Sequence, residues 1–212
     1  VVRRKGSFTM NPTKQAKIFD THAKMYEKRR KKTTIDTKWR HKLLDKADGD
    51  ILELSAGTGT NFPIYQNISS LTAVDFSLEM VRYAREAAKE TTYPCTVLHN
   101  DVEKLEFEEN TFNTVVSTLS MCSYPHPAFV LEQMAKWCKP GGQVLLFEHG
   151  VSTNPLVGKL QKKVDPLLSE RIGCHVDRDM LDYVKHSSLH VNRIESHLFG
   201  MFHLIFATKG EA

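Results

Sequence analysis

The chain has 212 residues and a net charge of +4, and 41% of its residues are hydrophobic while 25% are charged. This length suits one domain with a sizeable core, and the composition is ordinary for a globular protein. No run of about 18 apolar residues occurs, so a membrane-spanning helix is not expected.

The charge is unevenly distributed along the chain. Residues 1–46 contain 15 Lys and Arg against 4 Asp and Glu, a net charge of +11, and residues 47–212 contain 14 against 21, a net charge of −7. The basic part centres on Lys28, Arg29, Arg30, Lys31 and Lys32. No aromatic interleaving or RNA-binding module accompanies this run, so no nucleic-acid partner is expected. A solvated helix face and weak contact with an anionic membrane surface both stay open.

The N-terminal part divides into two segments. The chain does not begin with methionine and Met10 opens the more structured region, so residues 1–10 are expected to be the remnant of a tag or of a processed leader. Residues 11–46 are expected to form a basic helical lid. Within it Phe19, Ala23 and Tyr26 share one face of a predicted helix.

The segment from Ile51 to Asn61 contains the most informative pattern. A short apolar run with an acid at Glu53 leads into a small-residue loop, which is how a parallel strand brings a ligand to the carboxyl edge of a sheet. Gly57 and Gly59 let a ligand approach the backbone. A dinucleotide fingerprint would need a third glycine where the chain has Phe62, and a phosphate-binding loop would need a lysine after Gly59. A purely structural turn remains an alternative at this point.

The later segments predict an alternation of strands and helices. A helix is predicted to follow Ser77 as its N-cap, because apolar residues then repeat at helical spacing: Met80, Val81, Ala84, Ala87 and Ala88. Another helix is predicted at residues 179–186. A long, partly helical insert covers residues 154–170. Such alternation indicates βαβ units and a parallel sheet, closed by an antiparallel hairpin. The strands are expected at residues 51–54, 71–75, 95–102, 112–119, 143–148, 190–198 and 202–208, with a turn at 139–142.

Four ordered segments resemble the successive motifs of class I S-adenosylmethionine (AdoMet)-dependent methyltransferases: residues 53–59, 74–77, 100–103 and 139–142. The resemblance covers roughly residues 19–209. It implies an α/β, Rossmann-like fold with a mostly parallel seven-stranded sheet, a C-terminal antiparallel hairpin and helices on both faces. It also implies AdoMet as cofactor and residues 47–212 as the methyltransferase domain. Ser55 departs from the family, which usually has glycine there, and it is expected to adopt a β conformation.

The resemblance also implies cofactor contacts. Glu53 would order the loop and face the amino end of the methionine moiety, Asp75 would accept hydrogen bonds from both ribose hydroxyls, and Asp101 would accept the adenine amino group. For Asp75 and Asp101 the alternative is helix N-capping. The other implied contacts are the backbone of Ser55, Ala56, Gly57 and Gly59, apolar contact from Phe76 and Met80, the Val102 N–H, and Thr118 and Leu119 beside the methionine part.

The acceptor side is expected after the fourth and fifth strands. This region resembles the thiol S-methyltransferase branch of methyltransferase-like proteins. The matching residues are 118–119 with 122–123, 140–142, 147–149, 165–166, and 173–174 with Arg178. The pattern from Phe19 to Tyr26 resembles the first helix of quinone- and lipid-modifying methyltransferases. This resemblance implies that Tyr26 closes over the cofactor as a binding and candidate catalytic residue; the alternative is simple packing of an amphipathic helix.

Three histidines are candidate general bases, because an imidazole titrates near neutrality. They are His149, at the end of the fifth strand, and His126 and His175; the alternative for each is a structural, hydrogen-bonded histidine. Cys122 and Cys174 lie near them in the sequence, but the spacing fits no metal-ligand pattern, so no metal is expected.

The sequence therefore predicts an AdoMet-dependent methyltransferase acting on a small molecule, with a thiol or other soft nucleophile as first choice. A quinone or phospholipid-headgroup methyltransferase and a non-catalytic AdoMet-binding assembly factor are the alternatives. The four cysteines show no C-x-x-C spacing, which favours reduced thiols in the cytoplasm, with an organellar matrix or a peripheral membrane location also open. The oligomeric state is not predicted.

Overall fold

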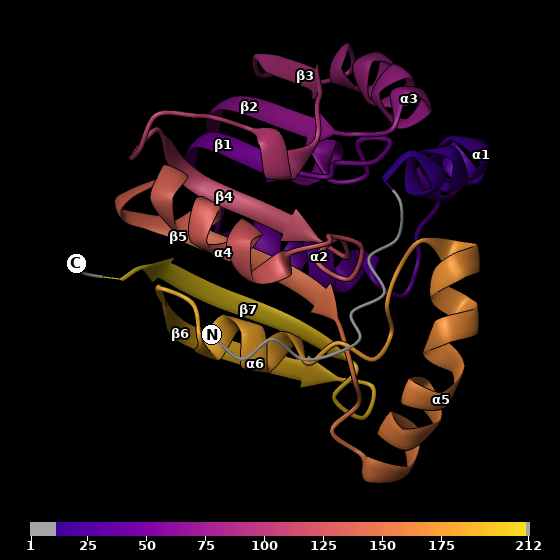
Figure 1. Cartoon of the computed structure of the whole chain (residues 1–212). Coiled ribbons are helices and arrows are strands. Elements are labelled where there is room, and N and C mark those ends of the chain that lie inside the picture. Colours follow the sequence, from indigo (N-terminus) through magenta and orange to yellow (C-terminus); the bar gives the residue numbers. More distant parts are fainter. Residues whose placement is uncertain (1–11, 211–212) are drawn as a thin grey trace.

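The computed structural model describes residues 12–210 and contains one seven-stranded sheet with the order β3-β2-β1-β4-β5-β7-β6 (Figure 1). Strands β1 to β5 are parallel, whereas β7 runs antiparallel to both β5 and β6. This confirms the predicted fold class, including the C-terminal hairpin. The strands are β1 (Gly49–Leu54), β2 (Ile68–Asp75), β3 (Cys95–His99), β4 (Phe112–Thr118), β5 (Cys138–His149), β6 (Leu189–His197) and β7 (Phe202–Lys209).

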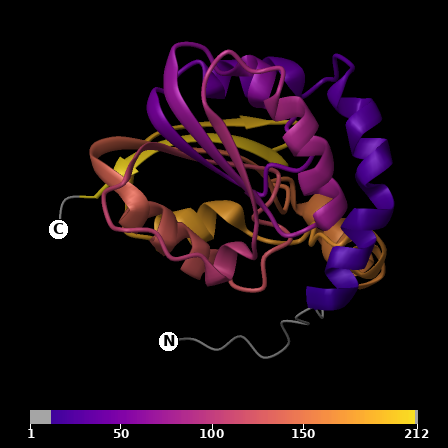
Figure 2. The ribbon, with the colours of Figure 1, turned by 90° about the horizontal axis from the view of Figure 1, so that it is seen from above.

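Helices cover both faces of the sheet because successive strand residues point to opposite sides (Figure 2). Leu52 and Leu54 pack with α4 and α6, while Ile51 packs with α2 and α3 on the other face. The two hydrophobic clusters bury most of the large apolar side chains. The helices are α1 (Pro12–Arg30), α2 (Thr37–Leu44), α3 (Leu78–Ala88), α4 (Pro127–Trp137), α5 (Pro155–Ile172) and α6 (Met180–Lys185), with short 3₁₀ turns η1 (Phe62–Ile64) and η2 (Val102–Lys104).

The N-terminal helix α1 lies beside α3 in both views of the ribbon (Figures 1 and 2). Ser77 is the N-cap of α3, as predicted, and its Oγ accepts a hydrogen bond from the Met80 N–H. The same hydroxyl donates to Asp20 Oδ1 at 2.6 Å, and that oxygen also accepts from the Glu79 N–H. One carboxylate of α1 therefore complements the positive end of α3 and fixes α1 against the domain.

Three of the differences from the predicted boundaries have a local reason, whereas β1 and β2 simply begin earlier than predicted, at Gly49 and Ile68. The third strand ends at His99 instead of residue 102, because the Asp101 carboxylate accepts from the Glu103 N–H and starts η2. The fourth ends at Thr118, because Leu119 has a φ of 56°. Residues 139–142 are not a free turn but a bulged beginning of β5, where the register shifts between Phe112 and Thr114 of β4.

The expected β conformation of Ser55 is also wrong. Its φ is 48°, in the left-handed region, and Gly57 and Gly59 share that sign at 58° and 81°. The chain leaves β1 by a sharp turn that repeatedly needs positive φ, which explains why glycine is usual at the position of Ser55. The Ser55 hydroxyl hydrogen-bonds the Tyr124 hydroxyl at 2.8 Å, a contact that glycine could not make.

The expected partly helical insert forms one helix, α5, which continues through Pro166. It begins at Asn154, whose side chain accepts from two backbone N–H groups, and ends at Gly173, whose φ is 74°. Within residues 12–210 no helix is long and apolar enough to span a bilayer. The predicted tag or leader remnant at residues 1–10 lies outside the described residues.

Candidate active site

A cavity of about 600 Å³ opens at the carboxyl ends of the parallel strands. Its wall is formed by α1, the loop after β1 and the ends of β2, β4 and β5, together with Ile172 at the end of α5 and Cys174 after it. Figure 1 shows α1 and α5 on this side of the sheet. Ligands of parallel α/β proteins bind at this edge, and the volume suits a nucleoside-sized ligand.

Asp75 provides a buried carboxylate in the cavity wall. Its Oδ2 accepts from the Gly57 N–H at 2.8 Å and its Oδ1 accepts from the Ser77 N–H at 2.9 Å. Burial raises the pKa of Asp75 to about 6, although these backbone hydrogen bonds oppose the shift. Asp75 is not the N-cap of α3, since Ser77 has that role. Each carboxylate oxygen retains acceptor capacity for a ligand hydroxyl.

The loop after β1 leaves open space toward the cavity. A Cβ atom built on Gly57 would meet no atom within 4 Å, so the backbone is open to a ligand there. Gly59 serves packing instead, because a Cβ at this position would lie 2.8 Å from the Phe62 ring. The hydroxyl of Thr58, another residue of the cavity wall, is buried and has no hydrogen-bond partner among the described residues. These features fit a ligand bound against the loop backbone.

Glu53 lies behind the loop, where it accepts from Asn61 Nδ2 and from the Tyr65 hydroxyl, both at 2.8 Å. Burial raises the pKa of Glu53 to about 7. Asn61 extends the network, because its amide also donates to Thr118 Oγ1 at the end of β4. Glu53 and Asn61 therefore link the loop to the neighbouring strand, while the predicted role of Glu53 in cofactor binding stays a prediction.

Arg40 on α2 completes this network and was not predicted. Its guanidinium donates to Asn61 Oδ1 at 2.8 Å and to Thr118 Oγ1 at 2.9 Å, and it forms an ion pair with Asp36. Burial alone would raise the pKa of Asp36, but hydrogen bonds from Thr34 and Arg40 hold it well below its usual range. In the sequence Arg40 is one of many basic residues of the N-terminal segment, and no pattern separates it from the rest.

Glu148, the penultimate residue of β5, holds the loop that follows β4. Its carboxylate accepts from the Ser117 hydroxyl at 2.6 Å and from the N–H groups of Ser120 and Met121 at 3.0 and 3.1 Å. The side chain is fully buried, and burial raises its pKa to about 7. Glu148 thus positions the backbone that leads into Cys122.

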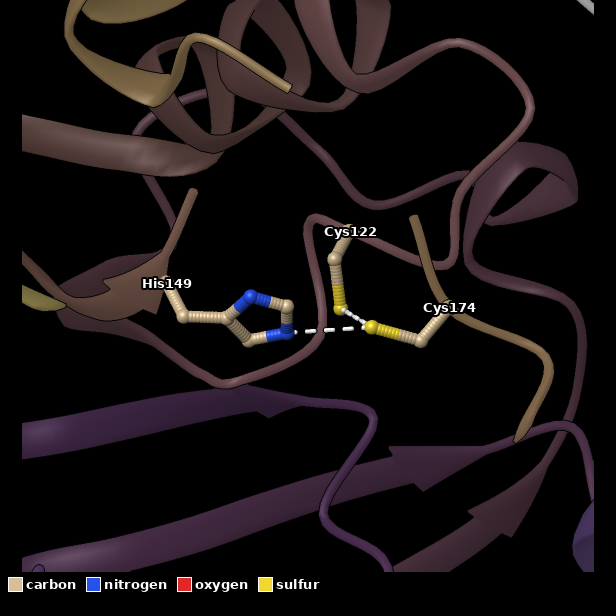
Figure 3. Close-up of side chains that lie close together, drawn as sticks. All are labelled: Cys122, His149 and Cys174. Atoms are coloured by element: carbon tan, nitrogen blue, oxygen red, sulfur yellow. Dashed lines mark hydrogen bonds between the residues drawn. The ribbon is translucent and has the colours of Figure 1, made fainter. Parts of the chain in front are cut away.

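Cys122, His149 and Cys174 form a triad on one wall of the cavity, and their side chains point toward one another (Figure 3). His149 Nε2 lies 3.0 Å from Cys174 Sγ, and the two sulfur atoms lie 2.7 Å apart. The segments meet because the His175 N–H donates to the Cys122 carbonyl at 3.0 Å. Three elements that are distant in sequence therefore converge at this point.

The charge state of the triad follows from its burial. The hydrogen bond with Cys174 and burial raise the pKa of the Cys122 thiol well above its usual range, so it stays neutral. Burial lowers the pKa of His149, but the neighbouring Cys122 and the Glu148 carboxylate outweigh burial and raise the pKa to about 9. Part of this rise depends on charge at Cys122, so a protonated Cys122 thiol makes it easier for the imidazole to be neutral and accept a proton.

The triad also offers two sulfur atoms and a nitrogen within 4.8 Å of one another, a donor set that zinc accepts. Two thiolates on one tetrahedral zinc ion, with bonds of about 2.3 Å, lie about 3.8 Å apart. In this structure the two sulfur atoms lie 2.7 Å apart, closer than two zinc-bound thiolates would be. The absence of a metal ion stays a prediction.

Most residues predicted from the sequence line the cavity. Burial has the largest effect on the Tyr26 phenol and raises its pKa, and the nearby Cys174 and Cys122 raise it further. Phe76 stacks edge-on against Phe19 of α1, with ring centroids 5.5 Å apart. The predicted residues in the cavity wall are Tyr26, Ser55, Ala56, Gly57, Asp75, Phe76, Met80, Thr118, Leu119 and His149.

The other predicted residues lie outside the cavity wall. His126 is exposed and its ring pairs with Glu103, while His175 pairs with Asp165 at 2.8 Å. Asp101 caps η2 and forms an ion pair with Lys104. Glu53 lies behind the loop, Gly59 packs against Phe62 within the loop, and Val102 is buried in the core cluster beneath α4.

The basic run at the end of α1 is partly neutralised within the fold. Arg29 pairs with Asp36, and Arg30, whose side chain is 7% exposed, pairs with Glu27 and Glu90. Lys31 also pairs with Glu27. Residues 29–32 border the cavity, so this run is a rim of the site as well as a surface. Its predicted membrane contact stays untested.

Comparison with known proteins agrees with this geometry. Residues 51–142 match a family model described as a methyltransferase domain. Phosphatidylethanolamine N-methyltransferase of Cereibacter sphaeroides is 37% identical over 103 residues, which are 48% of this chain and 51% of that protein. The ubiquinone/menaquinone biosynthesis C-methyltransferase UbiE of Bdellovibrio bacteriovorus is 28% identical over 71% of this chain and 68% of its own length. Thiol S-methyltransferase TMT1B of Rattus norvegicus is 27% identical over 61% of this chain and 55% of its own length.

The chain thus spans about half to two thirds of the length of these relatives. Among solved structures, geranyl diphosphate C-methyltransferase of Streptomyces coelicolor, determined with S-adenosyl-L-homocysteine, superposes with a TM-score of 0.66 at 12% identity, covering 82% of this chain and 79% of that one. This likeness shows the fold. The sheet order, the loop after β1 and the sequence matches are similar to those of class I AdoMet-dependent methyltransferases, and together they support that family for this chain.

Proposed function

We propose that the chain binds AdoMet in the cavity and transfers its methyl group to a small-molecule acceptor. The observation that carries the proposal is the Asp75 carboxylate, which lies in the cavity wall beside the open backbone at Gly57. A buried carboxylate with remaining acceptor capacity suits the two neighbouring hydroxyls of a ribose. When bound, AdoMet supplies a methyl group on a sulfonium, which is already a good electrophile.

The cofactor contacts follow from the cavity wall. Asp75 would hold the ribose, while Phe76 and Met80 would provide apolar contact for the adenine. The backbone from Ser55 to Gly59, with Ala56 and Gly57 on the cavity side, would run along the methionine part, flanked by Thr118 and Leu119. The adenine edge would approach Asp101 and the Val102 N–H at η2. Tyr26 on α1 would cover the carboxylate end and exclude water.

We assign the acceptor end to the wall formed by Cys122, His149 and Cys174. His149 is the one of the three predicted histidines in the cavity wall, and its Nε2 lies beside a sulfur atom there. A neutral imidazole at this place can take the proton that a thiol or hydroxyl acceptor loses on methylation. His126 and His175 are engaged by carboxylates elsewhere.

A thiol or other soft nucleophile is our first choice of acceptor. A thiol needs only modest help to ionise, because its reference pKa is about 8.5, and one imidazole can supply that help. The rat thiol S-methyltransferase among the relatives supports this choice. The free cysteines in the described residues fit a reducing compartment such as the cytoplasm or an organellar matrix.

A phospholipid headgroup or a quinone is the second candidate. The basic residues 29–32 on the cavity rim would suit a phosphate-bearing acceptor, and two relatives are named for phosphatidylethanolamine and quinone methylation. Proximity and orientation in a closed site would supply most of the catalysis for either acceptor.

Methyl transfer from labelled AdoMet to a panel of thiol, quinol and phospholipid acceptors tests the proposal. We expect labelled product from a thiol. Product from a quinol or phospholipid alone would favour the second candidate. Binding of AdoMet without transfer to any of the three would contradict methyl transfer and favour a non-catalytic, AdoMet-binding role.

A further inference from the structure

Helix α5 presents its apolar side chains outward. Leu156, Leu160 and Leu167 are 78%, 61% and 60% exposed, respectively. Their spacing of four and seven residues places them on one stripe of the helix. A surface helix of a globular protein ordinarily turns such a stripe toward the core. The stripe of α5 has no partner within residues 12–210.

The inward face of α5 is polar instead and is held by hydrogen bonds. Gln161 donates to the carbonyls of Gly150 and Val176 and accepts from the Ser152 N–H. Asp165 accepts from the Val176 N–H and pairs with His175. Figure 1 shows α5 beyond the end of the sheet, not on either face. The orientation of α5 is therefore fixed by its polar side, with the leucines directed outward.

A second exposed apolar segment lies at the start of α5. Phe199, in the turn between β6 and β7, is 69% exposed, and Leu198 beside it is 45% exposed. The Phe199 carbonyl accepts from the Thr153 N–H and from the Ser152 hydroxyl, just before α5 begins. The hairpin tip thus lies next to the start of the helix that carries the leucine stripe.

The charges beside the stripe are mainly basic. Lys159, Lys162, Lys163 and Arg171 are exposed and form no ion pair with the described residues. Of the two acids of α5, Asp165 is buried and paired, which leaves Glu170 alone on the surface. A second copy of this face would bring like charges together, whereas an anionic partner would complement them.

We propose that α5 and the tip of the β6–β7 hairpin dock on an anionic lipid bilayer. Protruding leucines and a phenylalanine flanked by lysines are the features of a helix that lies in the plane of a membrane interface. Ile172, the last residue of α5, lines the cavity. Docking would therefore bring the cavity mouth close to the bilayer. The proposal goes beyond the proposed function and does not depend on it.

Vesicle flotation of the full chain without AdoMet tests the docking surface. Phosphatidylcholine vesicles with and without phosphatidylglycerol serve as the probes. We expect binding to the anionic vesicles, and a loss of affinity of about tenfold or more when Leu156, Leu160 and Leu167 are replaced by Gln. Replacing Lys159, Lys162 and Lys163 by Gln should remove the preference for anionic lipid and the sensitivity to salt.

Two matched variants serve as controls. Leu78→Gln removes an equally exposed leucine from α3 and should leave vesicle binding unchanged. Replacing Lys28, Lys31 and Lys32 by Gln tests the end of α1 as the alternative basic surface. Because all the replaced side chains are exposed, unfolding transitions should match that of the parent chain.

Some results would overturn the proposal. Unchanged binding of the triple-leucine variant, or failure of the parent chain to bind anionic vesicles, would exclude this surface. Loss of vesicle binding only in the α1 variant would show that the membrane-binding surface is the end of α1 and not α5. If the leucine variant instead converts a dimer into a monomer in light scattering, the face is a protein interface and not a membrane surface.

Discussion

The two halves of the cavity are built in different ways. The half expected to hold the cofactor consists of strand ends and the loops directly after them, so that Glu53, Asp75 and Gly57 occupy places set by local backbone geometry. The acceptor half is assembled from the ends of β4 and β5 and from the segment after α5, which meet only through the fold. Affinity for AdoMet and choice of acceptor should therefore respond to different mutations.

His149→Ala is expected to separate the rate of methyl transfer from the affinity for AdoMet most sharply. Loss of a general base reduces methyl transfer by about 10²–10⁴-fold, while the affinity for AdoMet should stay as in the parent chain. The rate of the variant should then follow the ionisation of the acceptor thiol itself, near its reference pKa of about 8.5. Steady-state rates across pH, combined with calorimetric affinities, measure both quantities. His190→Ala, an exposed histidine on β6, is the control. Parallel loss of affinity and rate would contradict the separation.

Glu148→Ala should cause the largest loss of stability on the acceptor side. It leaves the donors of Ser117, Ser120 and Met121 buried without their acceptor. Each such group costs about 1–3 kcal/mol, so we expect a loss of about 3 kcal/mol or more in the free energy of unfolding. Urea denaturation measures it, with the exposed Glu109→Ala as control. A loss below about 1 kcal/mol would show that the loop does not depend on this carboxylate.

Stability and AdoMet affinity should change in opposite directions with pH. Burial raises the pKa of Glu53 and Glu148 to about 7 and that of Asp75 to about 6. Unfolded carboxyls titrate near 4, at about 3.9 for Asp and 4.3 for Glu, so between about pH 4 and 7 the folded chain binds more protons and is stabilised as pH falls. AdoMet affinity should instead rise as pH increases through about 6, because ionised Asp75 is the better acceptor.

Unfolding curves and AdoMet titrations at about pH 5.5 and 8 compare the two trends, with both values chosen to bracket the raised carboxyl pKa values. A chain that is more stable at the higher pH would show that these carboxyls are not the dominant titrating groups.

The smallest effect is expected from Ser55→Gly. Glycine relieves the left-handed conformation of this residue but loses the hydrogen bond to the Tyr124 hydroxyl. Each contribution is about 1 kcal/mol and they oppose each other, so the free energy of unfolding should change by less than about 1 kcal/mol. Tyr124→Phe removes the same hydrogen bond without changing the backbone and serves as the comparison in urea denaturation. A loss above about 2 kcal/mol in Ser55→Gly would mean that the hydroxyl is essential to the loop.

The unequal predictability of the two halves has a physical cause. Apolar runs, glycines and the acids at strand ends are local patterns, and they were sufficient to predict the sheet, the hairpin and most of the cavity wall on the cofactor side. Contacts such as Arg40 with Asn61, or Cys122 with Cys174, join residues that no short pattern relates. The outward leucines of α5 were also missed, because helical spacing alone does not tell which face is buried.

Calorimetric titration of the chain with AdoMet is the most direct test of the central claim that the cavity holds this cofactor through Asp75. We expect the parent chain to bind AdoMet. Asp75→Ala should weaken the affinity by tenfold or more, which is about 1.4 kcal/mol. Asp50→Ala, at the start of β1 and away from the cavity, should leave the affinity unchanged. Equal affinity of a folded Asp75→Ala variant, or no binding by the parent chain, would contradict the claim.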